Sequence, residues 1–329
     1  MTNQRAGILG TGHSYPEGIL TNEDLAKIVE TSDEWITTRT GIKQRRKAAP
    51  DEYTSMFAVR AARQAIERAR LDPSDIDLLL CATVTPDQIL PSTGCIVQAE
   101  LGANNAAAMD IVAACSGFLY GVSLADSMIR TGQVRHAVVV GAEILTQYVD
   151  YTDRQTCVLF GDGAGAAVLG PVGDGARGIL ASKIKSDGRY EEQLFSPGGG
   201  TRNKPTAETL AAGDHFFKMR GNELFKVAVR SMAEISRDVL QTAGAVSDDI
   251  SLFIPHQANQ RITEAVADRL NVDMSRVYSN IAVHGNTSSA SIPIALDECV
   301  EAGRIKEGDL VLLASFGGGV TWGAVLMRW

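Results

Sequence analysis

The feature that most constrains the fold of this chain is a sequence unit that occurs twice. Cys115 lies seventeen residues before Gly132, and Asn286 lies seventeen residues before Gly303, so the second pair repeats the first at an offset of 171 (286 − 115 and 303 − 132). Each unit starts among small residues and continues with apolar residues at helical spacing. The repeat predicts two related halves, in which a thiol and an amide begin equivalent helices and share one site.

Related segments surround both units in the same order. A strand-like run precedes each unit, another follows it, and a glycine turn then leads into a further apolar strand. In chain order these segments are 75–80, 137–140 and 160–163 in the first half, and 249–254, 310–313 and 316–319 in the second. Such alternation of helices and strands predicts an α/β fold.

The repeat also predicts the domain boundaries. Residues 1–170 are expected to form an N-terminal half that contains the cysteine, and residues 221–329 a C-terminal half that contains His256 and Asn286. The segment 171–220 is rich in Gly, Ser, Pro and charged residues, and is expected to be an insertion or connection. A length of 329 residues suits two such halves.

Composition argues against several classes of protein. The net charge of −8 disfavours general nucleic-acid binding, and no apolar stretch approaches the length needed to cross a bilayer. Five cysteines without a CxxC pair favour a reduced, cytoplasmic enzyme. No set of His, Cys and Asp residues has the spacing of metal ligands, so no metal is expected.

Cys115 has the sequence surroundings of a nucleophile. It follows a strand-like apolar run and precedes a helical pattern, and Ser116 and Gly117 allow a tight turn between them. The positive end of a helix dipole lowers the pKa of a thiol placed there, which favours the reactive thiolate. The alternative is a buried structural cysteine, which is the role we expect for the other four cysteines.

His256 and Asn286 are candidates for the same site. His256 follows a predicted strand, and the ends of strands are where α/β folds place their chemistry. A histidine can donate to a developing oxyanion or move a proton, and an asparagine amide can donate without titrating. Two such donors can hold the oxygen of an enolate. The alternative for each is a loop or core residue without a catalytic role.

The chain resembles β-ketoacyl-acyl-carrier-protein synthase III, the condensing enzyme that initiates type II fatty acid synthesis. The resemblance covers essentially the whole chain. It rests on Thr31–Ile36 with Arg39–Ile42, Ala113–Phe118, Phe160–Gly165, Gly221–Lys226, Pro255–Asn259, His284–Ser288 and Phe316–Gly319. It implies the thiolase fold, a duplicated five-layer αβαβα architecture, and a homodimer that needs no cofactor beyond its coenzyme A (CoA) thioester substrates.

The resemblance also implies a two-stage reaction. Cys115 takes an acyl group from acyl-CoA, and malonyl-acyl carrier protein then loses carbon dioxide to give an enolate that attacks the thioester. His256 and Asn286 are expected to stabilise the enolate oxygen. The backbone amides of Cys115 and Gly318 are expected to hold the oxyanion of the tetrahedral intermediate, and Phe316 to shape the site.

Two binding surfaces follow from the same resemblance. Trp35 and Arg154 are expected to sandwich the adenine of CoA. The remaining expected CoA contacts are Arg39, Thr40, Gly221, Phe225, Ala258 and Asn259. The acidic carrier protein is expected to dock on Lys226, Arg261 and Arg269; Asp268 departs here from the family's basic pair and is unsuited to that role. The alternative for these charges is a solvated surface.

The acyl primer is the least constrained feature. Leu90 stands where many short-primer members of the family have Phe, in a loop expected to reach across the dimer and wall the acyl pocket. Acetyl-CoA is the default primer, and a longer or branched primer, or a sister enzyme making a secondary metabolite, is the alternative. From another class, a non-catalytic carrier-binding protein would lack a use for the Cys, His and Asn. No GxSxG or complete GxGxxG motif supports a serine hydrolase or a dinucleotide-dependent dehydrogenase.

Overall fold

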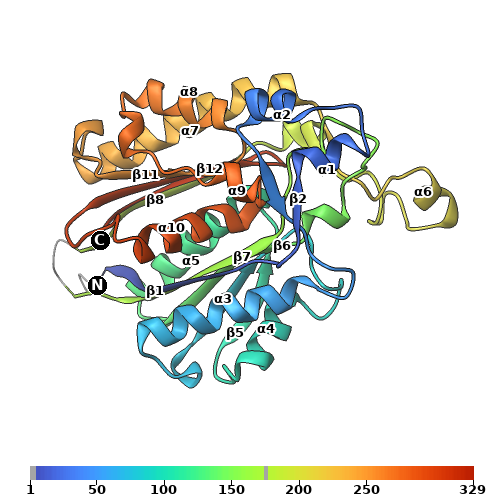
Figure 1. The fold of residues 1–329 in the computed structure, drawn as a ribbon. Coiled ribbons are helices and arrows are strands. Elements are labelled where there is room, and N and C mark those ends of the chain that lie inside the picture. Colours follow the sequence, from blue (N-terminus) through green and yellow to red (C-terminus); the bar gives the residue numbers. More distant parts are fainter. Residues whose placement is uncertain (1–4, 174–176) are drawn as a thin grey trace.

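The computed structural model describes residues 5–173 and 177–329, with the side chains of residues 221–223 also outside the description. Two sheets form its framework (Figure 1). The first has the strand order β1 (Ala6–Ser14), β7 (Gly163–Pro171), β6 (Ala137–Glu143), β4 (Leu78–Ala82) and β5 (Ala107–Ile111). The second has the order β8 (Gly178–Ser186), β13 (Thr321–Arg328), β12 (Leu310–Gly317) and β11 (Leu252–Pro255).

The two sheets have the same topology. In the first, β6 pairs parallel with β4 and antiparallel with β7, which is antiparallel to β1. In the second, β12 pairs parallel with β11 and antiparallel with β13, which is antiparallel to β8. The place of β5 is taken in the second sheet by a single parallel bridge between Phe253 and Val277. The duplication predicted from the sequence is therefore confirmed strand by strand.

Helices complete five layers. α3 (Thr54–Ala69) and α4 (Thr93–Leu101) cover the outer face of the first sheet, and α7 (Gly221–Ala243) and α8 (Gln260–Leu270) cover that of the second (Figure 1). α5 (Gly117–Arg130) and α10 (Ser291–Glu301) lie between the sheets, where their apolar residues pack against both in one core. This is the predicted αβαβα architecture.

The central helices show that the two units of the repeat align differently at their start than the sequence predicted. α5 follows a 3₁₀ turn that starts at Ala114 with φ 45°, and α10 follows a 3₁₀ turn that starts at Ser288 with φ 49°. The offset here is 174 (288 − 114), so the counterpart of Cys115 is Ser289, and the prediction that Asn286 occupies this place is wrong. The offset of 171 returns at Gly132 and Gly303 because α10 has 11 residues where α5 has 14.

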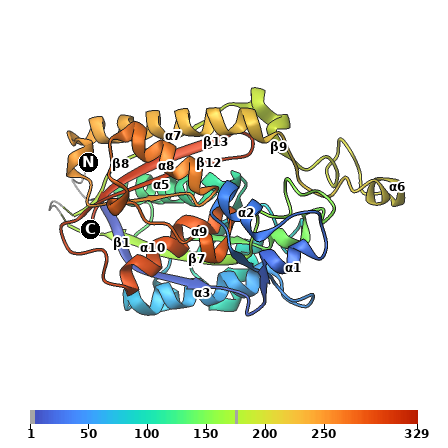
Figure 2. The ribbon, with the colours of Figure 1, turned by 45° about the horizontal axis from the view of Figure 1, so that its top comes forward.

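The domain boundaries also need correction. β8 lies within the segment 171–220, yet it pairs with β13 as the edge strand of the second sheet. The expected connection therefore contains a structural part of the C-terminal half. Residues 187–220 form an arm that contains α6 (Ala207–Ala211) and projects from the body in both views (Figures 1 and 2). The pairing of β9 (Leu194–Phe195) with β10 (Lys218–Met219) closes the arm at its base.

Short elements near the ends of the sheets complete the structure. β2 (Ile19–Thr21) and β3 (Gln44–Arg46) form a hairpin that encloses two helices. The short helices are α1 (Asn22–Ala26), α2 (Asp33–Thr40) and α9 (Ile281–His284). The isolated 3₁₀ turns are Pro73–Asp75, Leu145–Gln147, Gly188–Gln193, Ser247–Asp249 and Met274–Arg276. No helix among the described residues combines the length and apolar character needed to cross a membrane.

Candidate active site

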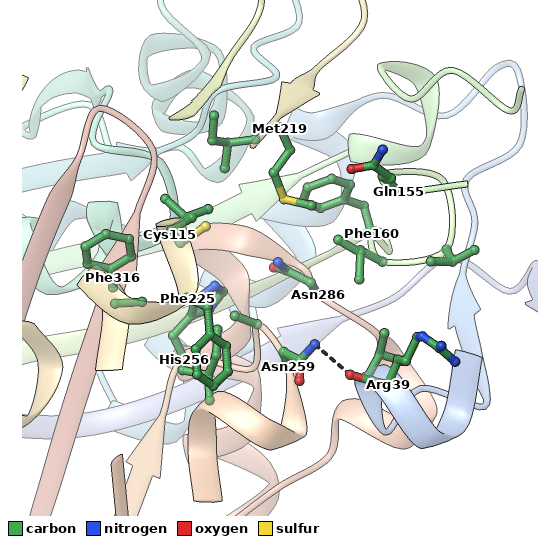
Figure 3. Close-up of a pocket in the computed structure, with 18 of the residues that line it drawn as sticks. Arg39, Cys115, Gln155, Phe160, Met219, Phe225, His256, Asn259, Asn286 and Phe316 are labelled. Carbon is green, nitrogen blue, oxygen red and sulfur yellow. Dashed lines mark hydrogen bonds between the residues drawn. The ribbon is translucent and has the colours of Figure 1, made fainter. Parts of the chain in front are cut away.

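Cys115 lies in the turn between β5 and α5, at the N-terminal end of the helix. It is buried, with 6% of its surface exposed, and it contributes to the wall of a cavity of about 310 Å³ that also contacts His256 and Asn286 (Figure 3). The end of β12 packs tightly on this turn, because a Cβ atom at Gly317 would lie 2.6 Å from the Cys115 amide nitrogen. The structure thus brings together the three residues predicted to do the chemistry.

His256 follows the last residue of β11 and presents one ring nitrogen to the cavity. Its Nδ1 lies 2.6 Å from Ser291 Oγ, and its Nε2 is buried with no hydrogen-bond partner among the described residues. The Gln257 amide donates to the same hydroxyl at 3.4 Å, which leaves the Ser291 proton for Nδ1. The ring proton then resides on Nε2, where it can be donated to a substrate oxygen.

Burial fixes the charge state of His256. Desolvation lowers the pKa of this imidazole to about 3, so the ring is neutral throughout the physiological range. Because the folded-state pKa lies below that of an unfolded histidine, the stability contributed by the neutral ring is present above about pH 6.5 and is lost as pH falls from there towards 3. A neutral Nε2–H group is a hydrogen-bond donor that adds no charge to the cavity.

Asn286 is held by the glycine turn that follows Phe160. The Asn286 amide donates to Leu159 O at 2.9 Å, and the Gly161 amide donates to Asn286 O at 3.0 Å. A Cβ atom at Gly161 would lie 2.2 Å from His284 O, so this approach requires glycine. The side-chain Oδ1 accepts from the Ser288 amide at 2.9 Å, which leaves the NH₂ group to donate towards the cavity (Figure 3).

The thiol of Cys115 is surrounded by hydrogen-bonding groups, of which the two backbone amides donate and the Ser288 hydroxyl gives its own proton to Glu143. The Ser288 hydroxyl and the backbone amides of Cys115 and Gly318 all bond to the sulfur and lower its pKa, but burial outweighs them and raises that pKa to about 12. The resting group at neutral pH is therefore the thiol. The two amides are the pair that was expected to form the oxyanion hole, and they converge beside the reactive atom.

A second cavity also borders Cys115. Its volume is about 230 Å³, and most of its wall is apolar: Val84, Ala114, Leu145, Phe160, Leu194, Phe195 and Phe217. Leu90 lines neither cavity of its own chain, and the residue is 83% exposed. This arrangement supplies an acyl-sized space beyond the sulfur and leaves the role predicted for Leu90 dependent on a second subunit.

α2 and α8 form the mouth of the larger cavity. Ser32 caps α2 by accepting from the Trp35 amide at 3.1 Å, and the helix ends at Gly41 with φ 83°. Asn259 caps α8, and its NH₂ group donates to Arg39 O at 3.0 Å, which joins the two helices (Figure 3). Both ends of the Asn259 side chain are therefore occupied, so this residue fixes the mouth of the tunnel.

Comparison with known proteins identifies the family. The family model of the 3-oxoacyl-[acyl-carrier-protein (ACP)] synthase III C-terminal part matches residues 240–329, and the 3-oxoacyl-[acyl-carrier-protein (ACP)] synthase III model matches residues 109–188. The β-ketoacyl-[acyl-carrier-protein] synthase III of Roseiflexus castenholzii is 52% identical over 324 residues, which cover 98% of each chain. The chain belongs to this family.

Solved structures of synthase III enzymes and of a related enzyme have the same fold. The 3-oxoacyl-[acyl-carrier-protein] synthase III of Aquifex aeolicus VF5 is 49% identical, with a TM-score of 0.91 over 98% of this chain and 100% of that one. The priming β-ketosynthase of the R1128 polyketide pathway is 35% identical, with a TM-score of 0.92 over 100% of this chain and 98% of that one. The family and the duplicated thiolase fold predicted from the motifs are both confirmed.

The residues expected to bind CoA in a synthase III lie together at the mouth, with one difference from expectation. The guanidinium groups of Arg39 and Arg154 lie 4.5 and 4.7 Å from the centre of the Trp35 ring. Direct stacking of Arg154 on Trp35 leaves no room for a purine between them, so Arg154 must move if the two are to sandwich one. Thr40, Phe225 and Ala258 line the cavity, whereas the surroundings of Gly221, which begins α7, lie outside the described residues.

The basic side chains expected to bind the carrier protein of a synthase III lie in two separate places. Lys226 and Arg261 flank the mouth: Lys226 follows Phe225 in α7, and the Arg261 guanidinium lies 5.9 Å from the centre of the Phe225 ring. Arg269 lies at the opposite end of α8, about 12 Å along the helix from Arg261. All three side chains are exposed, and Arg261 is the one that contacts a residue lining the cavity.

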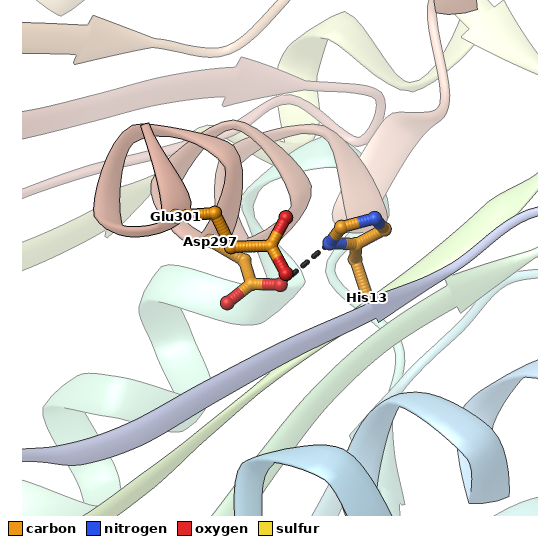
Figure 4. A group of neighbouring side chains, drawn as sticks. All are labelled: His13, Asp297 and Glu301. Carbon is orange, nitrogen blue, oxygen red and sulfur yellow. Dashed lines mark hydrogen bonds and ion pairs between the residues drawn. The ribbon is translucent and has the colours of Figure 1, made fainter. Parts of the chain in front are cut away.

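One cluster outside the site has the composition of a metal-binding group. His13, Asp297 and Glu301 bring their ligand atoms within 4.8 Å of one another (Figure 4). Arg68 donates to both carboxylates at 2.5 Å, and Thr11 also donates to Asp297. Burial lowers the pKa of His13, but bonding to Asp297 outweighs this effect and raises it above the ordinary value. A positively charged guanidinium between the carboxylates disfavours a cation there, and the absence of a metal stays a prediction.

Three polar residues around the site were not predicted. Ser291 orients His256, Ser288 bonds to the Cys115 sulfur, and Glu143 accepts from Ser288. Ser288 was part of a recognised motif without an assigned role. Glu143 is the last residue of the apolar strand β6, and nothing in the sequence around it shows that its carboxylate is buried against Ser288.

Replacement of Asn286 by Ala tests whether this residue acts in condensation and not in the acylation of Cys115. We expect acylation of Cys115 to continue, because the oxyanion amides are backbone groups. The condensation rate should fall by about a hundredfold, since loss of one oxyanion donor costs about 3 kcal/mol. Acyl transfer and condensation are measured separately in single-turnover assays, with Asn105→Ala, an exposed site, as the control. A normal condensation rate in the Asn286→Ala variant would contradict the role of Asn286 in stabilising the enolate oxygen.

Proposed function

We propose that this synthase III condenses an acyl-CoA primer with malonyl-acyl carrier protein, giving 3-oxoacyl-acyl carrier protein, CoA and carbon dioxide. The enzyme is an acyltransferase that initiates type II fatty acid synthesis. The observation that carries the proposal is one cavity in which the Cys115 thiol, the Nε2 atom of His256 and the amide of Asn286 meet. The substrates themselves are CoA and carrier-protein thioesters, so no further cofactor is required.

Acylation is the first stage. The sulfur of Cys115 attacks the carbonyl carbon of the acyl-CoA, and the carbonyl oxygen becomes an oxyanion held by the amides of Cys115 and Gly318. CoA leaves as its thiolate, and the acyl chain remains on Cys115 with its tail in the second cavity. The larger cavity, whose mouth is formed by Trp35, Arg39 and Asn259, admits the CoA arm and afterwards the carrier-protein arm.

Condensation is the second stage. The malonyl group loses carbon dioxide, and the negative charge that develops on its thioester oxygen is stabilised by His256 Nε2–H and the Asn286 NH₂ group. The enolate carbon then attacks the Cys115 thioester, which forms the new carbon–carbon bond and releases the thiolate. A neutral histidine suits this stage, because it donates a hydrogen bond without protonating the carbanion before it reacts.

Two kinds of acyl-CoA primer are candidates for the acyl pocket. Acetyl-CoA is the default primer of the family. The second cavity, at about 230 Å³ and with mainly apolar walls, has space for several more carbons than an acetyl group. This observation favours the alternative of a longer or branched primer.

Competition among primers tests the proposed reaction and its specificity. The enzyme is incubated with malonyl-acyl carrier protein and an equimolar mixture of acetyl-, isobutyryl- and hexanoyl-CoA, and the 3-oxoacyl products are quantified by mass spectrometry. We expect condensation products, with branched or six-carbon products exceeding the acetyl product if the second cavity accepts the chain. Acetyl product alone would confine the enzyme to the default primer. Absence of every condensation product would contradict the proposed function.

We also propose a homodimer joined along β5. This strand is at the edge of its sheet; Met109 within it and Val112 directly after it are 46% and 79% exposed. The loop with Ile89 and Leu90, 92% and 83% exposed, is joined to β5 by a 2.8 Å bond from the Thr93 amide to Asp110. A free strand edge flanked by apolar side chains is suited to pairing with a second copy, which would bring Leu90 to the partner's acyl pocket.

The same proposal includes a cytoplasmic location for the enzyme and a docking site for the carrier protein. All five cysteines are free, which fits the reducing cytoplasm where acyl carrier protein is used. The acidic carrier protein is proposed to dock beside the cavity mouth on Lys226 and Arg261, with Arg269 at the margin. The chain as a whole carries a net charge of −8, so this local positive charge has to supply the attraction.

Charge reversal at Arg261 tests the docking surface. We expect Arg261→Glu to raise the KM for malonyl-acyl carrier protein about fivefold at low salt, as loss of about 1 kcal/mol implies. The KM for acyl-CoA should change little, and added salt should reduce the difference between variant and wild type. Arg135→Glu, an exposed site at the opposite end of the first sheet, is the matched control. Equal effects of Arg261→Glu on both substrates would count against this surface.

A further inference from the structure

Glu143 is a carboxylate buried directly behind the catalytic turn. It ends β6 with 1% of its surface exposed. Its Oε2 accepts from the Val84 amide at 3.0 Å and from Thr85 Oγ1 at 2.7 Å, and no Lys, Arg or His among the described residues forms an ion pair with it. Burial raises the pKa of this carboxyl group. A carboxylate in such a place has the properties of a proton acceptor.

Ser288 connects this carboxylate to the nucleophile. Its hydroxyl lies 3.0 Å from Glu143 Oε1, bonds also to the sulfur of Cys115, and shares the walls of the acyl cavity with that residue. Ser289 also approaches Oε1, at 3.1 Å, but its hydroxyl has a closer acceptor in Ala82 O at 2.8 Å. Ser288 is therefore the hydroxyl that joins the sulfur to the acid.

The other titratable groups around the sulfur do not serve as its base. His256 is a poor acceptor, because desolvation lowers its pKa to about 3 and its Nδ1 is already bonded to Ser291. Cys81 and Tyr148 are near enough to feel the Glu143 charge, but burial raises the pKa of each, so both are protonated at neutral pH. Among these groups Glu143 is the one that can take the proton of a thiol whose own pKa is about 12.

We propose that Ser288 and Glu143 form a proton relay for Cys115, with Glu143 holding the proton of the thiol throughout the life of the acyl-enzyme. The inference rests on the proposed role of Cys115 as the nucleophile. As the sulfur attacks, its proton passes to Ser288 Oγ while the proton of that hydroxyl passes to Glu143 Oε1. The S–H bond breaks and an O–H bond forms on the acid, while the C–S bond forms and the negative charge moves from Glu143 to the carbonyl oxygen of the acyl-CoA.

The proton balance closes over both stages. CoA leaves as a thiolate and takes a proton from water, while Glu143 remains protonated beside the neutral thioester. In condensation the enolate displaces the Cys115 thiolate, and the proton returns from Glu143 through Ser288 to the sulfur. One proton from water is consumed per turnover, as the overall reaction requires. The relay never places a thiolate and a carboxylate together in the same buried space, where their repulsion would be large.

The duplicated fold supplies a matched pair of variants. Ser288→Ala removes the relay hydroxyl, and Ala114 already occupies the corresponding place of the other half with nearly the same φ, which shows that alanine fits this turn. Ser289→Ala removes the neighbouring hydroxyl, which contacts the same carboxylate but is outside the relay. Glu143→Gln keeps the shape of the acid and removes its basicity. Thermal unfolding of each variant separates loss of fold from loss of the relay.

The test is the pH dependence of Cys115 alkylation by iodoacetamide between pH 6 and 9, mapped by peptide mass spectrometry with the exposed Cys95 as an internal reference. We expect a nearly flat profile for the wild type and Ser289→Ala. Ser288→Ala and Glu143→Gln should react about a hundredfold more slowly at pH 6.5, the effect of losing a positioned base, and their rates should rise tenfold per pH unit.

Two results would overturn the relay. One is faster alkylation of Glu143→Gln with an unchanged slope, which is what removal of a repelling charge alone would cause. The other is identical behaviour of Ser288→Ala and Ser289→Ala. Alkylation needs no acyl-CoA, so a wild-type enzyme that is alkylated at Cys115 but never acylated there would refute the proposed function and leave the relay to be judged by these profiles.

Discussion

The close approach of the two sheets to the central turns is the constraint on which the site depends. A Cβ atom at Gly317 would lie 2.6 Å from the Cys115 amide nitrogen, and one at Gly141 would lie 2.3 Å from Ser289 O, so each sheet needs a glycine where it contacts a central turn. This packing leaves Cys115 6% and His256 2% exposed. The same exclusion of water raises the pKa of the thiol and lowers that of the imidazole.

Such burial decides how the chemistry can proceed. Stabilisation of the enolate is assigned to neutral donors, a histidine kept uncharged and an asparagine, and an isolated buried thiolate would be unfavourable. The two halves present different groups at one structural place: Cys115 in the first and Ser289 in the second, each preceded by a residue with φ near +47°. Duplication thus supplied two turns with the same backbone, of which one carries the nucleophile and the other holds Glu143.

The sequence predicted the fold and the three principal residues, because both depend on local patterns. Strand runs, glycine turns and the motifs around Cys115, His256 and Asn286 are contiguous in the chain. It misplaced the register at the start of α10, since α10 is three residues shorter than α5 and the predicted offset of 171 holds only at the C-terminal ends of the two helices. It also missed β8, because a strand is assigned to a sheet by the strand that it pairs with. It missed Glu143, because the direction of that carboxylate depends on residues from distant segments, Val84 and Ser288.

The most direct test of this account is the mass of the Cys115 peptide during a single catalytic cycle. The enzyme is mixed with acyl-CoA, quenched and digested, and the experiment is repeated with malonyl-acyl carrier protein added before the quench. We expect an acyl adduct on Cys115 alone among the five cysteines, and we expect it to disappear when the malonyl substrate is added. An unmodified Cys115, or an adduct that persists through product formation, would contradict it.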